Sequence, residues 1–150
     1  GYEGMDWLDR PEREKEENTS KLLKNMNIQS GNTVADIGAG SGYHVFKIAP
    51  AAKNGFVYAV DIQDEMLAVM DYRIDTGKID NVEVVKGSEK SVNLAVNSVE
   101  YRAEDARVPI KEVHKMSEKQ AVKEFKAAGF KLEKNISNLP WQHCMVFVKA

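Results

Sequence analysis

Short hydrophobic runs alternate with helical patterns through the first half of the chain. Residues 33–37, 56–60 and 82–86 are short runs rich in β-branched side chains, a pattern typical of buried parallel strands. Helical patterns occupy the intervals at about 43–53, with a break near Pro50, and from about 62 to 77. Strands that alternate with helices in this way predict an α/β fold built on a parallel sheet.

The N-terminal pattern predicts a tail followed by an amphipathic helix. Residues 1–8 show no period and are interpreted as a surface tail, with a lid over a ligand as the alternative. Asp9 and Pro11 are residue types that open a helix. The core face of this helix is expected to contain Thr19, Leu22, Leu23 and Met26. The charged run at 10–17 is expected to form its solvated face.

The C-terminal pattern predicts a capped helix and a hairpin. Ser117 and Gln120 form a predicted capping box ahead of a helix, which Gly129 is expected to end in a left-handed conformation. The strand-like runs at 130–137 and 141–149 are joined by only three residues. Because so short a link cannot make a parallel crossover, the two runs are expected to pair antiparallel.

Composition excludes several classes of function. At 150 residues the chain is long enough for one domain over 1–150, and its 21 basic and 23 acidic residues give no broad positive surface for nucleic acid. The single cysteine, Cys144, allows no internal disulfide, and no ligand cluster predicts a metal. No run is long and apolar enough to span a membrane, so a cytoplasmic protein is expected, although a chain that begins with Gly1 leaves room for a removed leader.

A glycine-rich loop directly after the first predicted strand carries the candidate chemistry. Gly38, Gly40 and Gly42 allow a tight turn, and the start of the following helix favours a polar or anionic ligand group. In the dinucleotide fingerprint the third glycine comes one residue later, at the position of Tyr43 here. Asp36 precedes the first glycine by two residues. The spacing therefore indicates a nucleotide-type cofactor and disfavours a dinucleotide.

Polar side chains follow the next two predicted strands as well. Asp61 ends the second strand, about twenty residues past the glycine loop, where a carboxylate can reach the ribose of a cofactor. Ser88 and Glu89 follow the third strand. Because ligands bind beyond the carboxyl ends of parallel strands, this loop is expected to face the same crevice as Asp36 and Asp61, with a plain polar turn as the alternative.

The pattern Asp36-x-Gly38-x-Gly40-x-Gly42 resembles the first motif of class I S-adenosylmethionine-dependent methyltransferases, and the final hairpin is similar to theirs. The resemblance covers residues 9–97 and 100–149. It implies a Rossmann-like methyltransferase three-layer sandwich, a mostly parallel sheet with a C-terminal antiparallel hairpin. It implies S-adenosylmethionine as the cofactor and S-adenosylhomocysteine as the product. The cofactor-binding residues that it implies are Asp36, Gly38, Gly40, Gly42, Asp61, Ile62, Ser88 and Glu89.

The resemblance breaks between residues 91 and 101. Methyltransferases of this class have a fourth strand, a helix and a fifth strand here, whereas this chain passes directly into 99–102, which is similar to the tail of the fifth strand. A block of residues is therefore expected to be absent near Asn97–Glu100, which would leave the first strand without its central neighbour. Alternatively, residues 92–102 form one strand that fills the vacant place.

The family resemblance implies methyl transfer to an unidentified small-molecule acceptor. Because methyl transfer depends mainly on alignment, a catalytic base is not required, and His114 is the candidate for substrate contact ahead of His44 and His143. A catalytically silent domain that binds S-adenosylmethionine or a nucleotide is the second hypothesis. A nicotinamide-dependent oxidoreductase is the third, and the early glycine and the hairpin disfavour it. The sequence indicates neither the acceptor nor the oligomeric state.

Overall fold

The computed structural model describes residues 5–87, 97–108 and 115–150. The chain divides into two compact units, one formed by Gly1–Arg13 with Asn27–Leu94 and the other by Glu14–Met26 with Ala95–Ala150. The predicted α/β class, with a parallel sheet and a C-terminal antiparallel hairpin, is confirmed. That residues 1–150 form a single methyltransferase domain stays a prediction.

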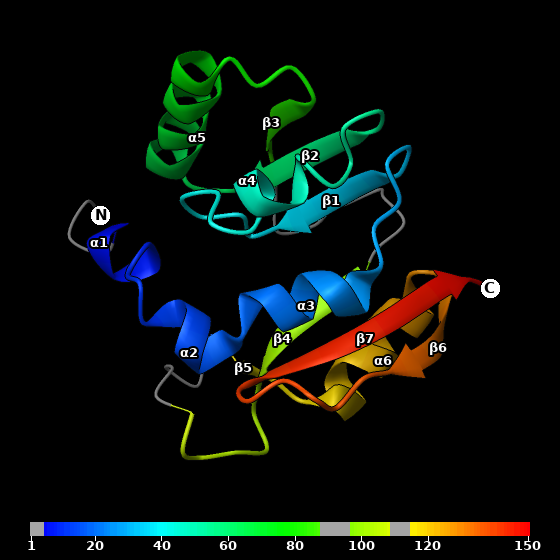
Figure 1. Ribbon diagram of the computed structural model, residues 1–150. Helices are drawn as coiled ribbons and strands as arrows, with labels where there is room; N and C mark the ends of the chain where they lie inside the picture. The colour runs from blue at the N-terminus through cyan, green and yellow to red at the C-terminus, as the bar shows by residue number, and fades with distance from the viewer. Residues whose placement is uncertain (1–4, 88–96, 109–114) are drawn as a thin grey trace. The chain divides into compact units, whose positions relative to one another are not determined.

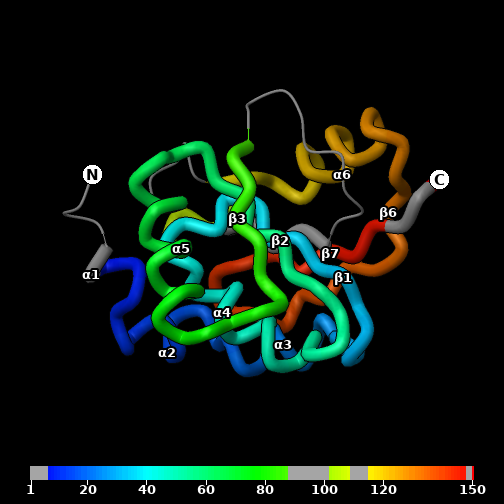
Figure 2. The backbone as a smooth tube through the Cα atoms, turned by 90° about the horizontal axis from the view of Figure 1, so that it is seen from above, coloured from blue at the N-terminus to red at the C-terminus, as the bar shows by residue number. Residues whose placement is uncertain are grey.

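The first unit contains a parallel three-stranded sheet in the order β1-β2-β3 (Figure 1). Its elements are α1 (Met5–Leu8), β1 (Thr33–Ile37), α4 (Val45–Ile48), β2 (Phe56–Asp61), α5 (Asp64–Gly77) and β3 (Val82–Lys86). The three strands lie side by side in Figure 2, and α5 packs against both β2 and β3. The buried side chains include Val45, Ile48, Val57, Ala59, Met66 and Met70. The pattern of strand and helix in this part of the chain was therefore predicted correctly.

Two details of the first unit differ from the prediction. The helix expected over 43–53 with a break near Pro50 is reduced to the four residues of α4, which end before that proline as predicted. Pro50 explains the early end, because it has no N–H to continue the helix and its ring crowds the preceding turn. The strand β1 is only partly buried, with Thr33 and Ile37 exposed. Within the described residues β2 is the only strand that pairs with β1, so no described strand is hydrogen-bonded to the second edge of β1.

The second unit contains a four-stranded mixed sheet in the order β5-β4-β7-β6. Its elements are α2 (Arg13–Glu17), which begins at the last residue of the first unit, α3 (Thr19–Met26), β4 (Asn97–Arg102), β5 (Lys115–Met116), α6 (Glu118–Ala127), β6 (Phe130–Asn135) and β7 (Gln142–Lys149). β6 and β7 pair antiparallel, with a register shift between Leu132 and Lys134, which confirms the predicted hairpin. β4 pairs antiparallel with β7 and parallel with β5.

The core of the second unit lies on both faces of β7. Because successive side chains of a strand point to opposite faces, Cys144 packs with Leu22 of α3, whereas Met145 and Phe147 pack with Ala121 of α6. Figure 1 shows α3 and α6 beside this strand. Burial raises the pKa of the Cys144 thiol, a shift that Lys134 opposes. Each face of β7 is therefore covered by one helix.

The expected break near Asn97–Glu100 coincides with the start of β4. Residues 88–96 lie outside the described residues. Of the alternative single strand over 92–102, the structure therefore describes only the part from Asn97 to Arg102, which forms β4. The described strands form two separately hydrogen-bonded sheets, and no described strand other than β2 is hydrogen-bonded to β1. That a block of residues is absent here stays a prediction.

The single N-terminal helix of the prediction is wrong. Asn18 adopts a left-handed backbone conformation, with φ of 53°, and separates α2 from α3. Its side-chain oxygen accepts a hydrogen bond from the Lys21 N–H at 3.2 Å and so caps α3. The charged run at 10–17 is not uniformly solvated either, because Arg13 and Glu17 are buried.

Candidate functional site

The glycine loop between β1 and α4 has the conformation that its composition favours. Gly38, Gly40 and Gly42 have φ angles of 75°, 55° and 86°, a region that other residues rarely adopt. At Gly42 a Cβ atom would also lie 2.4 Å from the ring of Phe46. The three glycines are therefore required by the turn itself.

Hydrogen bonds fix this loop against the end of β2. The N–H groups of Gly38 and Ala39 donate to the Val60 carbonyl oxygen at 2.8 and 3.0 Å, and the Gly40 N–H donates to Asp61 Oδ2 at 2.8 Å. These donors, which could have faced a ligand, are used within the protein. The loop is thus fixed before any ligand binds. The groups that can bind a charged ligand are the carboxylates of Asp36 and Asp61 beside the loop.

Asp36 and Asp61 stand at the carboxyl ends of neighbouring strands. Asp36 pairs in register with Ala59, so the end of β2 carries Asp61 just beyond it. Asp36 is half-buried as a residue, but its Oδ2 is enclosed and has no hydrogen-bond partner among the described residues. Burial raises the pKa of Asp36 to about 6, a shift that the Arg13 charge opposes and the Asp61 charge increases. A carboxylate in this state favours a cationic hydrogen-bond donor.

Asp61 is buried and holds two backbone groups. Its Oδ1 accepts the Gln63 N–H at 2.9 Å, in addition to the bond from Gly40 to Oδ2. Because each carboxylate oxygen can accept a second bond, Asp61 retains acceptor capacity for hydroxyl groups. The Gly87 N–H, at the end of β3, donates to the Asp61 carbonyl oxygen at 2.9 Å. The end of β3 therefore lies beside Asp61.

Two isoleucines add apolar surface at the carboxyl ends of the same strands. Ile62 follows β2 and is 56% exposed, and Ile37 ends β1 and is 41% exposed. These two side chains offer an apolar surface to a flat ligand group. The remaining predicted site residues, Ser88, Glu89 and His114, lie outside the described residues.

The other two candidate histidines have structural neighbours. The His44 ring contacts Tyr43 edge-on, with centroids 5.3 Å apart. His143 is buried in β7, where its Nε2 lies 2.9 Å from Glu104 Oε2 and its Nδ1 lies 3.3 Å from Arg102 Nη1. Because a guanidinium only donates, Nδ1 must accept and Nε2–H must donate, which fixes the neutral tautomer.

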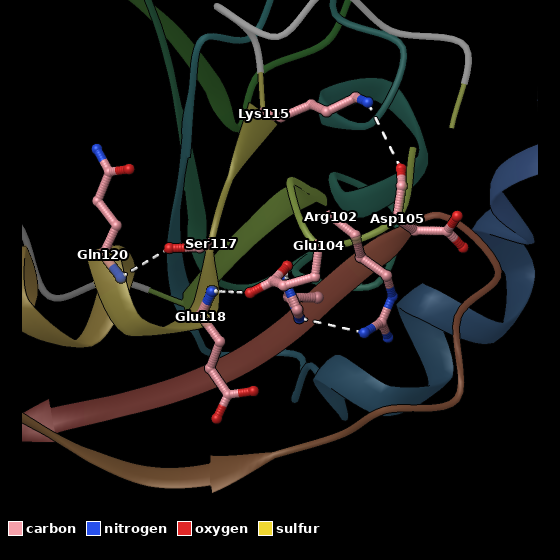
Figure 3. Close-up of polar contacts among 8 residues, drawn as sticks. Arg102, Glu104, Asp105, Lys115, Ser117, Glu118 and Gln120 are labelled. Atoms are coloured by element: carbon pink, nitrogen blue, oxygen red, sulfur yellow. Dashed lines mark hydrogen bonds and ion pairs between the residues drawn. The ribbon is translucent and has the colours of Figure 1, made fainter. Parts of the chain in front are cut away.

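Glu104 also joins His143 to the start of α6. Its Oε1 accepts the Glu118 N–H at 2.8 Å, as Figure 3 shows. Partial burial raises the pKa of Glu104, but the bonds from His143 and Glu118 outweigh it and lower the pKa overall. Ser117 Oγ accepts the Gln120 N–H at 3.1 Å, whereas the Gln120 side chain donates to Glu124 and not back to Ser117. Only half of the predicted capping box therefore forms.

Sequence reasoning missed a polar cluster that holds the glycine loop from outside. Asp9 was expected to cap a helix, but its carboxylate accepts the Ser41 hydroxyl at 2.7 Å and pairs with Arg73. Arg73 lies on α5 three residues after the buried Met70, on the inward stripe of that helix. A charged residue in an apolar stripe is the signal that could have identified it.

Within the described ranges, no group of three or more His, Cys, Asp or Glu side chains could hold a metal ion. None of the helices described is both long and apolar enough to cross a membrane.

The chain matches a family model described as a methyltransferase domain over residues 28–99. It is 32% identical over 78 residues to the probable cobalt-precorrin-6B C(15)-methyltransferase (decarboxylating) of Methanocaldococcus jannaschii, which covers 52% of this chain and 42% of that protein. It is 24% identical over 105 residues to the demethylmenaquinone methyltransferase of Geobacillus stearothermophilus, covering 64% of this chain and 45% of that protein. The chain thus spans less than half the length of these curated relatives.

Among solved structures, the fold is similar to that of a SAM dependent methyltransferase from Aquifex aeolicus, with a TM-score of 0.80 over 98% of this chain and 97% of that chain. The two sequences are 19% identical, so this likeness concerns the fold alone. Residues 28–99 therefore match the model of a methyltransferase domain, and the chain has a Rossmann-like methyltransferase fold.

Proposed function

We propose that the protein binds S-adenosylmethionine at the carboxyl ends of β1 and β2 and transfers its methyl group to a small-molecule acceptor. One observation carries the proposal: the enclosed Oδ2 of Asp36, which has no hydrogen-bond partner among the described residues. A buried acceptor of this kind is unfavourable unless a ligand supplies the missing donor. The α-ammonium group of S-adenosylmethionine is such a donor.

The negative charge of the site favours this cofactor over a dinucleotide. Asp36 and Asp61 are close enough for the charge of Asp61 to raise the pKa of Asp36. Two carboxylates at a glycine loop repel a pyrophosphate but attract an ammonium group and accept bonds from hydroxyl groups. The geometry therefore favours S-adenosylmethionine over a nicotinamide dinucleotide.

Each part of the cofactor has a matching residue in this chain. We assign the amino-acid end to Asp36 and the walls of Gly38, Gly40 and Gly42, and the ribose hydroxyls to the remaining acceptor capacity of Asp61. The exposed face of Ile62 suits the adenine ring. Ser88 and Glu89, which follow β3 along the chain, are proposed to bind the adenine edge. These assignments follow the family resemblance and are supported by the neighbouring strand ends.

The bound cofactor supplies a methyl group on a positively charged sulfur, which an acceptor attacks in line. Positioning accounts for most of the rate in such a transfer, so the main work of the protein is to hold and shield the reactants. A base is needed only for an acceptor that must lose a proton, and His114 stays the candidate. The curated relatives are named for demethylmenaquinone and cobalt-precorrin-6B, which makes small cyclic acceptors the first class to examine. An absence of nucleic-acid partners and a cytoplasmic location stay predictions.

A catalytically silent domain that binds S-adenosylmethionine is the second candidate. No described strand other than β2 is hydrogen-bonded to β1, and this favours the second candidate, because the strand expected beside β1 would line the methyl-transfer site. Turnover separates the two candidates, because both bind S-adenosylmethionine.

Calorimetric titration with S-adenosylmethionine and S-adenosylhomocysteine tests the binding step. We expect micromolar binding, loss of binding in Asp61→Ala, and no heat with NAD. Incubation with methyl-labelled cofactor and a panel of quinone and tetrapyrrole acceptors then tests turnover. Transfer of label supports the enzyme, binding without transfer to any acceptor favours the silent domain, and no binding by folded protein contradicts both.

A further inference from the structure

A cluster of Asp9, Ser41 and Arg73 joins the N-terminal segment to the glycine loop. None of these residues is assigned to the cofactor. The Ser41 hydroxyl donates to Asp9 Oδ1 at 2.7 Å, and Arg73 forms an ion pair with Asp9 Oδ2. Arg73 Nη1 also donates to the Ser41 carbonyl oxygen at 2.8 Å. Ser41 lies between Gly40 and Gly42, so both groups act on the centre of the loop.

A second set of contacts joins the same two segments. Arg13 lies over the ring of Tyr43, 3.9 Å from the centroid, and donates to the Leu8 carbonyl oxygen at 2.6 Å. Leu8 reaches to 3.6 Å from the position that a Cβ atom would take on Gly40. Leu8, Asp9 and Arg13 therefore lie against the loop at Gly40, Ser41 and Tyr43 in turn, and Asp9 is the polar centre of the contact.

The Asp9 contact is stronger than an ordinary surface ion pair. Burial raises the pKa of Asp9, but the hydrogen bonds from Arg73 and Ser41 outweigh this effect and lower the pKa overall. The side chains of Arg73 and Asp9 are 34% and 29% exposed. Isolated exposed pairs contribute little, whereas this partly buried pair shares Ser41 as a third partner. The cluster can therefore hold the loop in one conformation.

We propose that Asp9 and Arg73 are positioning residues for S-adenosylmethionine, which act by holding Ser41 and with it the glycine loop in the conformation that binds the cofactor. This inference rests on the proposed function. The loop contains three glycines, which lose much conformational freedom when ordered. We call the cluster of Asp9, Ser41 and Arg73 the clasp. Because it orders the loop before the cofactor binds, it reduces the entropy lost on binding and so increases affinity.

Amide hydrogen exchange without any ligand tests the clasp itself. In Asp9→Asn and Arg73→Gln we expect the peptide that covers residues 38–43 to exchange roughly tenfold faster than in the wild type. Exchange in β2 and β3 should be unchanged, which separates a local effect from global destabilisation. Arg107→Gln is the matched control, because Arg107 is 90% exposed and pairs only with the nearby Asp105 among the described side chains. Unchanged exchange at 38–43 would overturn the proposal.

Titration with S-adenosylmethionine tests the coupling to the site. We expect each single variant to weaken binding roughly tenfold, the double variant to weaken it no further, and Arg73→Lys to restore part of the affinity. Wild-type protein that fails to bind would contradict the proposed function and this coupling together. Wild-type protein that binds while the variants bind equally well, or effects that simply add in the double variant, would contradict only the role of the clasp.

Discussion

Asp36 combines a requirement for binding with a disadvantage for stability. Its enclosed Oδ2 has no hydrogen-bond partner among the described residues, and burial raises its pKa to about 6. A side chain chosen for stability alone would be neutral or fully hydrogen-bonded. The same feature makes the position suitable for a cationic ligand group.

This conflict predicts a pH dependence of stability. The pKa of Asp36 rises from 3.8 to about 6 in the folded protein. Between these pH values the folded state therefore binds more protons than the unfolded state. The free energy of unfolding should therefore fall as pH rises through this window. Asp36→Asn should remove that slope and raise the free energy of unfolding at pH 7 by roughly 1–3 kcal/mol. Denaturant titrations at several pH values measure this, with the exposed Asp71→Asn as control. An unchanged slope in Asp36→Asn would contradict the burial of this charge.

Gly42 is restricted by backbone conformation and by packing together. Its φ is 86°, and a Cβ atom would lie 2.4 Å from the Phe46 ring. Gly42→Ala should lower the free energy of unfolding by about 2–4 kcal/mol in a denaturant titration. Gly31→Ala is the control, because no atom lies within 4 Å of its Cβ position and its φ is not positive. We expect the control to change stability by less than about 0.5 kcal/mol. Equal effects at the two glycines would be the contrary result.

At the scale of elements, hydrophobic period and glycine position were sufficient for most of the fold. The predicted runs at 33–37 and 82–86 match β1 and β3, the run at 56–60 lies within β2, and Gly129 ends α6 with φ of 88°. The break at Asn18 was not predictable, because it depends on a left-handed conformation that asparagine tolerates but does not require.

The candidate site was predictable only where a motif marks it. The glycine loop and Asp61 follow from spacing along one strand–helix–strand unit. The contact of Asp9 with Arg73 joins residues 64 positions apart, and the apolar stripe that marks Arg73 does not indicate its partner. The burial of Arg13 likewise depends on tertiary packing against Tyr43.

The half-formed capping box of α6 gives a prediction at this scale. Ser117→Ala removes the acceptor for the Gln120 N–H and should lower the free energy of unfolding by about 1 kcal/mol. Gln120→Ala removes only an exposed bond to Glu124 and should lower it by a few tenths of a kcal/mol. Chemical denaturation of both variants measures the difference. A larger loss in Gln120→Ala would indicate the complete capping box.

At the scale of the whole molecule, the proposed cofactor residues lie in one of the two compact units. Asp36, the glycine loop and Asp61 all belong to the unit that contains Asn27–Leu94. Binding of S-adenosylmethionine should therefore slow amide exchange most strongly at 36–43 and 61–63. The β6–β7 hairpin, in the other unit, should change less. Exchange measurements with and without the cofactor test this, and stronger protection in the hairpin would contradict the location of the site.

The most direct test of the cofactor site is a calorimetric titration of wild type and Asp36→Asn with S-adenosylmethionine at pH 7.5. The wild type should bind with micromolar affinity, because the ionised Asp36 carboxylate receives the ammonium group of the cofactor. The variant should bind at least about tenfold more weakly although it is the more stable protein. Equal affinity in the two proteins, or no binding by folded wild type, would contradict the assignment of this site to S-adenosylmethionine.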